Sequence, residues 1–162
     1  MEAEIKEYSD RDLPELIKIW NEVVDGGVAF PQEERLDEKS GREFFAKQDF
    51  VGAAKCGDET VGLYILHPNN VGRCSHIANA SYAVLSSKRG LKIGEKLVSH
   101  SLLKAGELGY KILMFNAVVK GNDSAIHIYK KLGFHKIGEV PSGYRLSDGT
   151  YRDINLYYHE IP

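Results

Sequence analysis

The order of the apolar segments constrains the fold of this chain more than any other feature of its sequence. Two segments of strand-like composition, 50–55 and 60–66, are joined by a Gly57-Asp58 turn, which is typical of an antiparallel hairpin. A third such segment follows at 76–85, and from there helical and strand-like segments alternate. Antiparallel pairing followed by alternation predicts a mixed α/β sheet with helices on both faces.

The periodic spacing of hydrophobic residues, together with the turn-forming residues, predicts the remaining elements. One face of the first helix is apolar, with Ser9 or Asp10 as its cap and Gly26-Gly27 as its end. The other expected elements are a strand through Ile5 and Tyr8, a short helix with Phe44 and Phe45, a helix with Ile93, Leu97, Val98, Leu102, Ala105 and Leu108 buried and Gly109 at its end, a strand 111–119, a helix 124–132 ended by Gly133, and strands 134–140 and 154–158 separated by a loop.

Length and composition indicate an ordinary globular protein. With 162 residues we expect one domain over 1–162, and 43% hydrophobic with 27% charged residues is a typical balance. No apolar run approaches the roughly 18 residues that would cross a bilayer. The N-terminus is charged and lacks the apolar stretch of a secretion signal. We therefore expect a cytoplasmic protein without a membrane partner.

Charge and cysteine usage exclude two further classes of function. The formal net charge is -2 and the basic residues are scattered, so nucleic acid is not an expected partner. Cys56 and Cys74 are too few and too far apart for a zinc knuckle or a redox pair, and no two histidines stand four apart. We expect no metal.

The segment 89–94 lies between a strand that ends in Tyr82-Ala83-Val84 and a long helix. A helix N-terminus presents unpaired backbone N–H groups and a partial positive charge, which suit a phosphate or pyrophosphate. Arg89 or Lys92 would add charge. The alternative is a strand-to-helix turn that needs its glycines for geometry alone. The segment matches neither the P-loop nor the Rossmann glycine pattern.

Two motifs resemble those of the GCN5-related N-acetyltransferase (GNAT) family. Arg89-x-x-Lys92-x-Gly94 resembles the [RQ]-x-x-G-x-[GA] pyrophosphate loop, with Lys92 in place of the central glycine. The second hallmark is matched by Asn122-x-Ser124-Ala125, Tyr129 and Leu132-Gly133-Phe134. The resemblance extends over nearly the whole chain. We expect Lys92 to lie inside the first helical turn, where a lysine is sterically acceptable.

The resemblance implies the GNAT fold, a mostly antiparallel sheet that splays at its centre to admit acetyl-coenzyme A. It implies that Tyr82, Ala83 and Val84 pair with the pantetheine arm and that residues 89–94 hold the pyrophosphate. The cofactor-binding residues it implies are Tyr82, Ala83, Val84, Arg89, Gly90, Leu91, Lys92, Ile93, Gly94, Asn122, Ser124, Ala125 and Tyr129.

Tyr129 is the candidate general acid that the resemblance implies. Attack of an amine on a thioester expels a thiolate, and a phenol, with a reference pKa near 10, can donate to it without ionising at neutral pH. Asn122 lies seven residues earlier, on the same helical face. The alternative is that the Tyr129 ring only packs, with its hydroxyl in solvent.

The general base is not evident from the sequence. Many relatives carry a glutamate on the strand that corresponds to 76–85, which has no carboxylate here. His76 titrates in a useful range but begins a strand, where a histidine is more often structural. Asn79 and Asn116 can orient an amine but cannot accept its proton at neutral pH. An ordered water is the default base.

Within the family, two subgroups are similar to this chain. Trp20-Asn21-Glu22 with Phe30, and Gly143-Tyr144-Arg145, resemble the phosphinothricin-type amino-acid acetyltransferases. Residues 72–80 with Phe115-Asn116 resemble the fungal enzymes that acetylate toxic proline analogues.

The second of these resemblances implies that two asparagines hold the substrate. That role falls on Asn79, which we also place at the catalytic centre, and on Asn116. A structural bridge between strands is the equal alternative. Phe30 and Tyr144 are the further candidates for substrate contact.

We therefore expect an enzyme that transfers acetyl from acetyl-coenzyme A directly to the amine of a small molecule, an amino acid or analogue. Peptide substrates need an open groove, whereas the Phe30 loop and the 141–153 loop can close over a small molecule. The alternatives are acetylation of a protein lysine or N-terminus, and a non-catalytic acyl-coenzyme A sensor. A homodimer is expected from the phosphinothricin-type resemblance.

Overall fold

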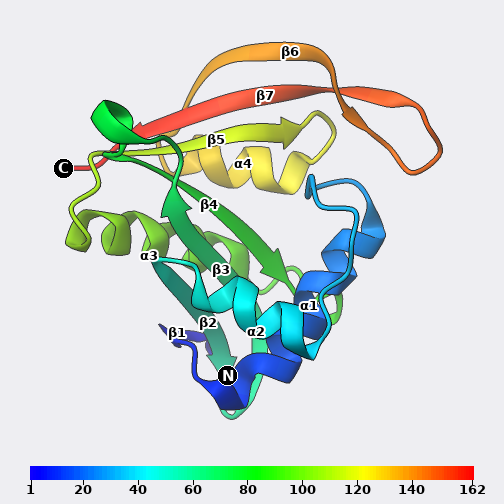
Figure 1. Cartoon of the computed structure of the whole chain (residues 1–162), viewed down its shortest axis with the longest axis vertical. Helices are drawn as coiled ribbons and strands as arrows, with labels where there is room; N and C mark the ends of the chain where they lie inside the picture. Colours follow the sequence, from blue (N-terminus) through cyan, green and yellow to red (C-terminus); the bar gives the residue numbers. More distant parts are fainter.

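The chain folds around one seven-stranded sheet with the order β1-β2-β3-β4-β5-β7-β6. The computed structural model describes all residues 1–162 (Figure 1). The strands are β1 Glu4–Glu7, β2 Phe50–Cys56, β3 Glu59–Pro68, β4 Ile77–Val84, β5 Ile112–Val119, β6 His135–Arg145 and β7 Tyr151–Glu160. Every neighbouring pair is antiparallel except β4 and β5. The expected mixed, mostly antiparallel sheet is confirmed.

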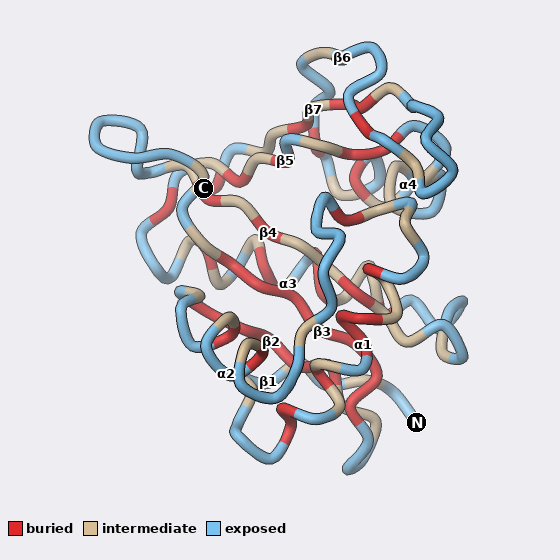
Figure 2. The backbone as a smooth tube through the Cα atoms, turned by 45° about the vertical axis from the view of Figure 1, so that its right-hand side comes forward, coloured by how far each residue is buried: buried red, intermediate tan, exposed pale blue.

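Four α-helices cover the two faces of the sheet, as expected. They are α1 Leu13–Gly26, α2 Glu38–Ala46, α3 Ile93–Glu107 and α4 Asp123–Lys131. The helices α1 and α2 pack on one face, where Trp20, Phe45 and Leu63 share a core. The helices α3 and α4 pack on the other, around Leu97 and Leu113. Figure 2 shows the buried backbone along the inner strands and α1.

The parallel pair β4–β5 separates soon after it begins. Its register contains only Ile77 with Ile112 and Ala78 with Leu113. Beyond these pairs the two strands diverge, which Figure 1 shows as a wedge that opens along β4. The splayed centre expected of the sheet is therefore present, and it lies between the two motifs.

The predicted loop over 141–153 is wrong. The strand β6 continues to Arg145 and β7 starts at Tyr151, so only residues 146–150 connect them. Pro141-Ser142-Gly143 has turn composition, yet it forms an irregularity in the edge strand between the register positions Val140 and Tyr144. Ser142 has a positive φ of 54° there, and Asp153 Oδ1 accepts its backbone N–H at 2.9 Å.

The predicted burial of Leu108 is also wrong, since its side chain is 45% exposed. The helix α3 ends at Glu107, and the backbone N–H of Tyr110 returns to the carbonyl of Ala105. Gly109 adopts a positive φ of 90° in this turn. The turn places Tyr110 in the core, so Leu108 points outward. No helix of the chain is long and apolar enough to cross a membrane.

Candidate active site

The edge of β4 that faces the wedge carries free backbone groups. Leu85 donates its N–H to Val61 and Ile77 accepts from Asn69, so the odd-numbered residues of β4 bond toward β3. Ladder alternation then directs the N–H and C=O groups of Tyr82 and Val84 toward β5, which has already diverged. The free groups at this edge are therefore those of Tyr82 and Val84.

Ala83 differs from its two neighbours in this ladder. Its register partner is Leu63, and its polar backbone groups belong to the β3–β4 ladder. The contact expected of the segment 82–84 with an extended ligand therefore narrows to Tyr82 and Val84. Ala83 contributes its side chain to the core on the face of α1 and α2 instead.

The segment before α3 presents a cluster of unpaired donors. The first backbone bond of the helix runs from the N–H of Lys96 to the carbonyl of Lys92, and none of the N–H groups of residues 90–95 donates to an acceptor in the chain. These groups and the positive end of the helix dipole are chemically suited to an anion. They fit the pyrophosphate role expected of residues 89–94.

Lys92 does not lie inside the first helical turn, so that expectation is wrong. It is the N-cap residue of α3, with φ 59° and ψ 20°, in the left-handed region. A residue with a Cβ atom is strained in this region by about 1–2 kcal/mol. A glycine, which the resembled motif has at this position, would adopt the same conformation without that strain. Arg89 and Lys92 are exposed, and neither takes part in an ion pair within the chain.

Tyr129 extends from α4 into an aromatic cluster on the sheet. Its ring centroid lies 4.5 Å from that of Phe115 and 5.8 Å from that of Tyr157, and the residue is 9% exposed. Its hydroxyl has no hydrogen-bond partner in the chain, yet it is not sealed, since the sealed unpaired side-chain atoms belong to Gln48 and Asn155. Burial, and secondarily Tyr157, raises the pKa of Tyr129, so it stays protonated at neutral pH.

Two further tyrosines of the same core, Tyr82 and Tyr64, have hydroxyls that are already hydrogen-bonded. Ser101 Oγ donates to the carbonyl of Val98 at 2.7 Å, so the Tyr82 hydroxyl, also 2.7 Å from Ser101 Oγ, must be the donor of that pair. The Tyr64 hydroxyl bonds to His100 Nδ1 at 2.8 Å. Between Tyr82 and Tyr129, only Tyr129 keeps a free hydroxyl proton.

The N-terminus of α4 carries the second motif. Asn122 is the N-cap residue, but its side chain makes no capping hydrogen bond and is free for a ligand. Ser124 is exposed, whereas Ala125 packs against the core that holds Tyr129. Asn122 and Tyr129 lie two helical turns apart on one face, so the helix links the open end of the wedge to the aromatic cluster.

Asn79 bridges β4 and β5 at the point where they separate. Its Nδ2 donates to the carbonyl of Met114 at 2.9 Å, one residue beyond the last backbone pair. Met114 O is an acceptor only, so this contact fixes the orientation of the amide, and Asn79 Oδ1 keeps no partner. The bridge that was one of the two alternatives for Asn79 exists, and it leaves an acceptor oxygen available.

Asn116 is exposed on β5. It lies at an irregularity in the pairing of β5 with β7, between Phe115 and Val118, where the backbone turns its side chain outward. Its Nδ2 donates to Asn69 Oδ1 at 2.6 Å. Met114 and Asn116 share one face of β5, opposite the face of Phe115, and Asn79 meets that face at Met114.

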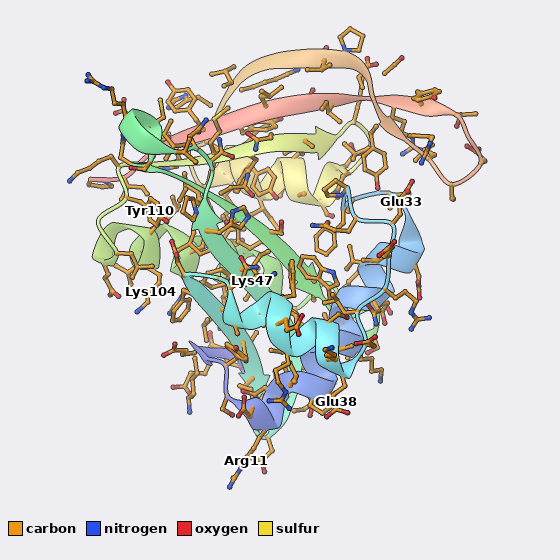
Figure 3. The ribbon with its side chains drawn as sticks, in the orientation of Figure 1. Arg11, Glu33, Glu38, Lys47, Lys104 and Tyr110 are labelled. Atoms are coloured by element: carbon orange, nitrogen blue, oxygen red, sulfur yellow. The ribbon has the colours of Figure 1, made fainter.

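The segment between α1 and α2 meets the β6–β7 hairpin. The hydroxyl of Tyr144 donates to the carbonyl of Phe30 at 2.6 Å, and Arg145 pairs with Glu33. Phe30 itself is buried against Trp20, with ring centroids 4.3 Å apart. Figure 3 marks Glu33 on this segment, between α1 and the β6–β7 hairpin. Phe30 and Tyr144, far apart in sequence, are thus in direct contact.

Sequence reasoning missed three residues that support the site. Asn69 holds Asn116, Ser101 accepts from Tyr82, and Glu22 accepts the backbone N–H of Ser86 at 2.6 Å, which anchors the segment before residues 89–94 to α1. Each has a polar side chain without a motif of its own. Only Glu22 carried a signal, because it belongs to the Trp20-Asn21-Glu22 resemblance. His76, considered as a base, is exposed before β4, at the end where β4 and β5 still pair.

The family model described as the acetyltransferase (GNAT) family matches residues 13–134, about three quarters of the chain. The chain belongs to the GNAT family. The match includes both motifs and every strand from β2 to β5. The chain is therefore an acyltransferase, a GNAT N-acetyltransferase that takes its acetyl group from acetyl-CoA.

Curated relatives of this GNAT chain are N-acetyltransferases. It is 27% identical over 160 residues to the N-acetyltransferase aca1 of Schizosaccharomyces pombe, which covers 88% of this chain and 77% of the relative. It is 26% identical over 167 residues to an L-methionine sulfoximine/L-methionine sulfone acetyltransferase of Pseudomonas paraeruginosa, with 96% of each chain covered.

A solved structure supports the fold of this GNAT chain. The GNAT superfamily phosphinothricin acetyltransferase of Sinorhizobium meliloti, in complex with AcCoA, superposes with a TM-score of 0.91 at 19% identity, covering 99% of this chain and 89% of that one. The unpaired N–H groups of residues 90–95 and the free edge of β4 fit the two polar parts of acetyl-CoA, its pyrophosphate and its amide-containing arm.

Proposed function

We propose that this enzyme acetylates the amine of a small molecule, an amino acid or an amino-acid analogue. The observation that carries the proposal is the contact of the segment between α1 and α2 with the β6–β7 hairpin, through Tyr144 with Phe30 and Arg145 with Glu33. A peptide acceptor needs an open groove between these elements. Because the two elements are in contact, the site favours a small acceptor that does not extend between them.

The names of the relatives support the same substrate class. The relative that matches over 96% of both chains is described as acting on methionine sulfoximine and methionine sulfone, which are amino-acid analogues. Identity of 26% does not carry a substrate over by itself. It agrees, however, with the independent structural argument from the closed end of the site.

We assign recognition of the acceptor amine to Asn79 and Asn116. Asn79 Nδ2 is held by Met114 O and Asn116 Nδ2 by Asn69 Oδ1, so both amides keep their oxygens free. Amide oxygens are hydrogen-bond acceptors, and an amine or ammonium group is a donor. Two such oxygens beside the wedge suit the nitrogen of the acceptor. The acceptor amine must lose a proton, and neither amide can accept one at neutral pH, so we assign that proton to a water molecule.

We assign the role of general acid to Tyr129. Acetyl-CoA supplies an acetyl thioester, whose transfer releases a thiol. Tyr129 holds its proton on Oη at neutral pH, because burial raises its pKa, and its hydroxyl has no competing partner. A positioned hydroxyl of this kind contributes roughly 10²–10⁴-fold to a rate. The cluster of Phe115 and Tyr157 fixes the orientation of its ring.

The test is release of thiol from acetyl-CoA in the presence of methionine sulfoximine, phosphinothricin, proline analogues, polyamines and a lysine-containing peptide. The expected result is turnover with at least one amino acid or analogue and none with the peptide. Turnover with the peptide alone would replace the proposal with protein acetylation. Tight binding of acetyl-CoA by calorimetry, with no acceptor-dependent release across a wide amine panel, would favour a sensor.

A further inference from the structure

We propose that Asn69 is a positioning residue for the acceptor amine, acting through Asn116. Asn69 follows β3 in the connection to β4 and belongs to neither motif. The inference rests on the proposed function, because it requires the amide of Asn116 to contact the acceptor. It adds a residue to the site and specifies which atom of Asn116 is available.

Asn116 needs an external support because its strand is irregular at that point. The register of β5 with β7 shifts between Phe115 and Val118, so Asn116 has no partner in the ladder. Its side chain is exposed and would sample several rotamers if nothing held it. Its only side-chain hydrogen bond is the one that Nδ2 donates to Asn69 Oδ1, at 2.6 Å.

Asn69 is itself held in place by three contacts. Its backbone N–H donates to the carbonyl of Ile77 at 2.8 Å, which extends the β3–β4 ladder by one step. Its Nδ2 donates to Asn70 Oδ1 at 2.7 Å and lies 3.9 Å from the sulfur of Met114. These contacts leave Oδ1 directed at Asn116. The half-buried Asn69 is held by the β3–β4 ladder, and it in turn holds the exposed side chain of Asn116 in one orientation.

These contacts determine which kind of hydrogen bond Asn116 can make with the acceptor substrate. With Nδ2 occupied by Asn69, the free polar atom of Asn116 is Oδ1, an acceptor. Asn79, held by Met114 O, presents the same atom type on the neighbouring strand. Met114, between them, contacts Asn79 through its carbonyl and Asn69 through its sulfur. The arrangement selects a group that donates, such as the amine of the acceptor, over a group that only accepts.

The test compares Asn69→Ala, Asn69→Asp and Asn116→Ala in the full chain, with the acceptor found in the thiol-release panel. Loss of one neutral hydrogen bond corresponds to roughly a fivefold to tenfold effect. We expect Asn69→Ala to raise the KM for the amine by about that factor, and we expect the same of Asn116→Ala. The KM for acetyl-CoA and the melting temperature should stay unchanged, because residues 90–95 and the core are untouched.

Two comparisons separate positioning from a general structural role. Asn69→Asp keeps an oxygen that accepts from Asn116 Nδ2, so it should restore the KM for the amine to within about twofold of the original enzyme. The double variant with Asn116→Ala should be no worse than Asn116→Ala alone, because both changes remove one interaction. Val71→Ala, an exposed residue of the same connection, is the matched control.

The outcomes distinguish the inference from the proposed function. If Asn116→Ala raises the KM for the amine and Asn69→Ala does not, or if the two effects add in the double variant, Asn69 is not a positioning residue and the proposed function stands. If Asn116→Ala leaves the KM for every amine unchanged, the assignment of Asn116 fails and the role of Asn69 fails with it. Neither result bears on turnover of a small amine as such.

Discussion

The hydroxyl of Tyr144 donates to the carbonyl of Phe30 at 2.6 Å, although 114 residues separate them in the chain. The contact joins the β6–β7 hairpin to the segment between α1 and α2. Asn21 pins the far end of that segment, since its amide both donates to and accepts from the backbone of Leu36. The segment is thus held at both ends, and Phe30 within it shares a core with Ala83 of β4.

Tyr144→Phe tests whether this contact shapes the acceptor site. The change leaves a buried carbonyl without its donor, which costs about 1–3 kcal/mol of stability. We expect a lower melting temperature, a raised KM for the amine and an unchanged KM for acetyl-CoA. Tyr151→Phe is the control, because Tyr151 is exposed and its hydroxyl bonds to nothing in the chain. An unchanged KM for the amine despite a lower melting temperature would reduce the contact to a purely structural role.

Tyr129→Phe tests the general acid. The ring and its packing against Phe115 are retained, so we expect kcat to fall about a hundredfold while both KM values stay near those of the original enzyme. Tyr151→Phe, a change at an exposed tyrosine where β7 begins, serves as the comparison. Full turnover by the Tyr129 variant would show that the hydroxyl does not act on the leaving group.

The pH profile of kcat follows from the raised pKa of Tyr129. Burial disfavours the phenolate, so the proton stays on Oη beyond the ordinary value of about 10. We therefore expect no alkaline loss of kcat from this residue up to about pH 10. The measurement is kcat from pH 7 to 10 at saturating substrates. An alkaline limb below pH 10 that disappears in Tyr129→Phe would mean that Tyr129 titrates with a lowered pKa.

Lys92→Gly tests the strained N-cap of α3. Glycine adopts φ 59° without the clash that lysine has, which relieves about 1–2 kcal/mol of strain. The greater backbone entropy of glycine in the unfolded chain offsets part of this, so we expect a net gain in stability of about 1 kcal/mol. The same change removes a positive charge beside the free N–H groups of residues 90–95 and should raise the KM for acetyl-CoA, most at low salt. Lys92→Met removes the charge and keeps the strain. A KM for acetyl-CoA unchanged in both variants would exclude a role of the ammonium group.

Asp12→Asn tests an ion pair that supports α1. Burial of Asp12 opposes its ionisation, but the bonds from Lys55 Nζ at 2.6 Å and from the backbone N–H of Ser9 at 2.8 Å outweigh it and lower its pKa. Because its pKa is lowered in the folded state, ionised Asp12 stabilises the fold fully at pH values above its ordinary pKa near 4. This stabilisation is lost as the pH falls from about 4 through the lowered pKa of the folded state.

The expected cost of Asp12→Asn is about 1.5–3 kcal/mol at pH 7, the range for hydrogen bonds to charged groups, and it should shrink toward zero as Asp12 becomes protonated. Denaturant unfolding at pH 7 and pH 3 measures it. Asp58→Asn, in the exposed β2–β3 turn, is the control. A cost that is equal at both pH values would show that the charge of Asp12 does not stabilise the fold.

The sequence by itself determined the order of the elements, and it predicted a cofactor site at residues 89–94. Apolar period, the Gly57-Asp58 turn and the helix-ending glycines are local signals, and local backbone preferences decide local structure. The resemblance that the two motifs carry implied the splayed strands. Tyr129 could be assigned from its place in the second motif.

Only the tertiary structure decided how the acceptor side is built. Pro141-Ser142-Gly143 looked like a loop because turn residues carry no signal for the distant strand that pairs with them. Lys92 appeared compatible with a helical turn, since a residue pattern does not report the sign of φ. The bonds of Asn116 to Asn69 and of Tyr144 to Phe30 join residues 47 and 114 positions apart. Such contacts depend on where the sheet places each side chain, and no local preference encodes that.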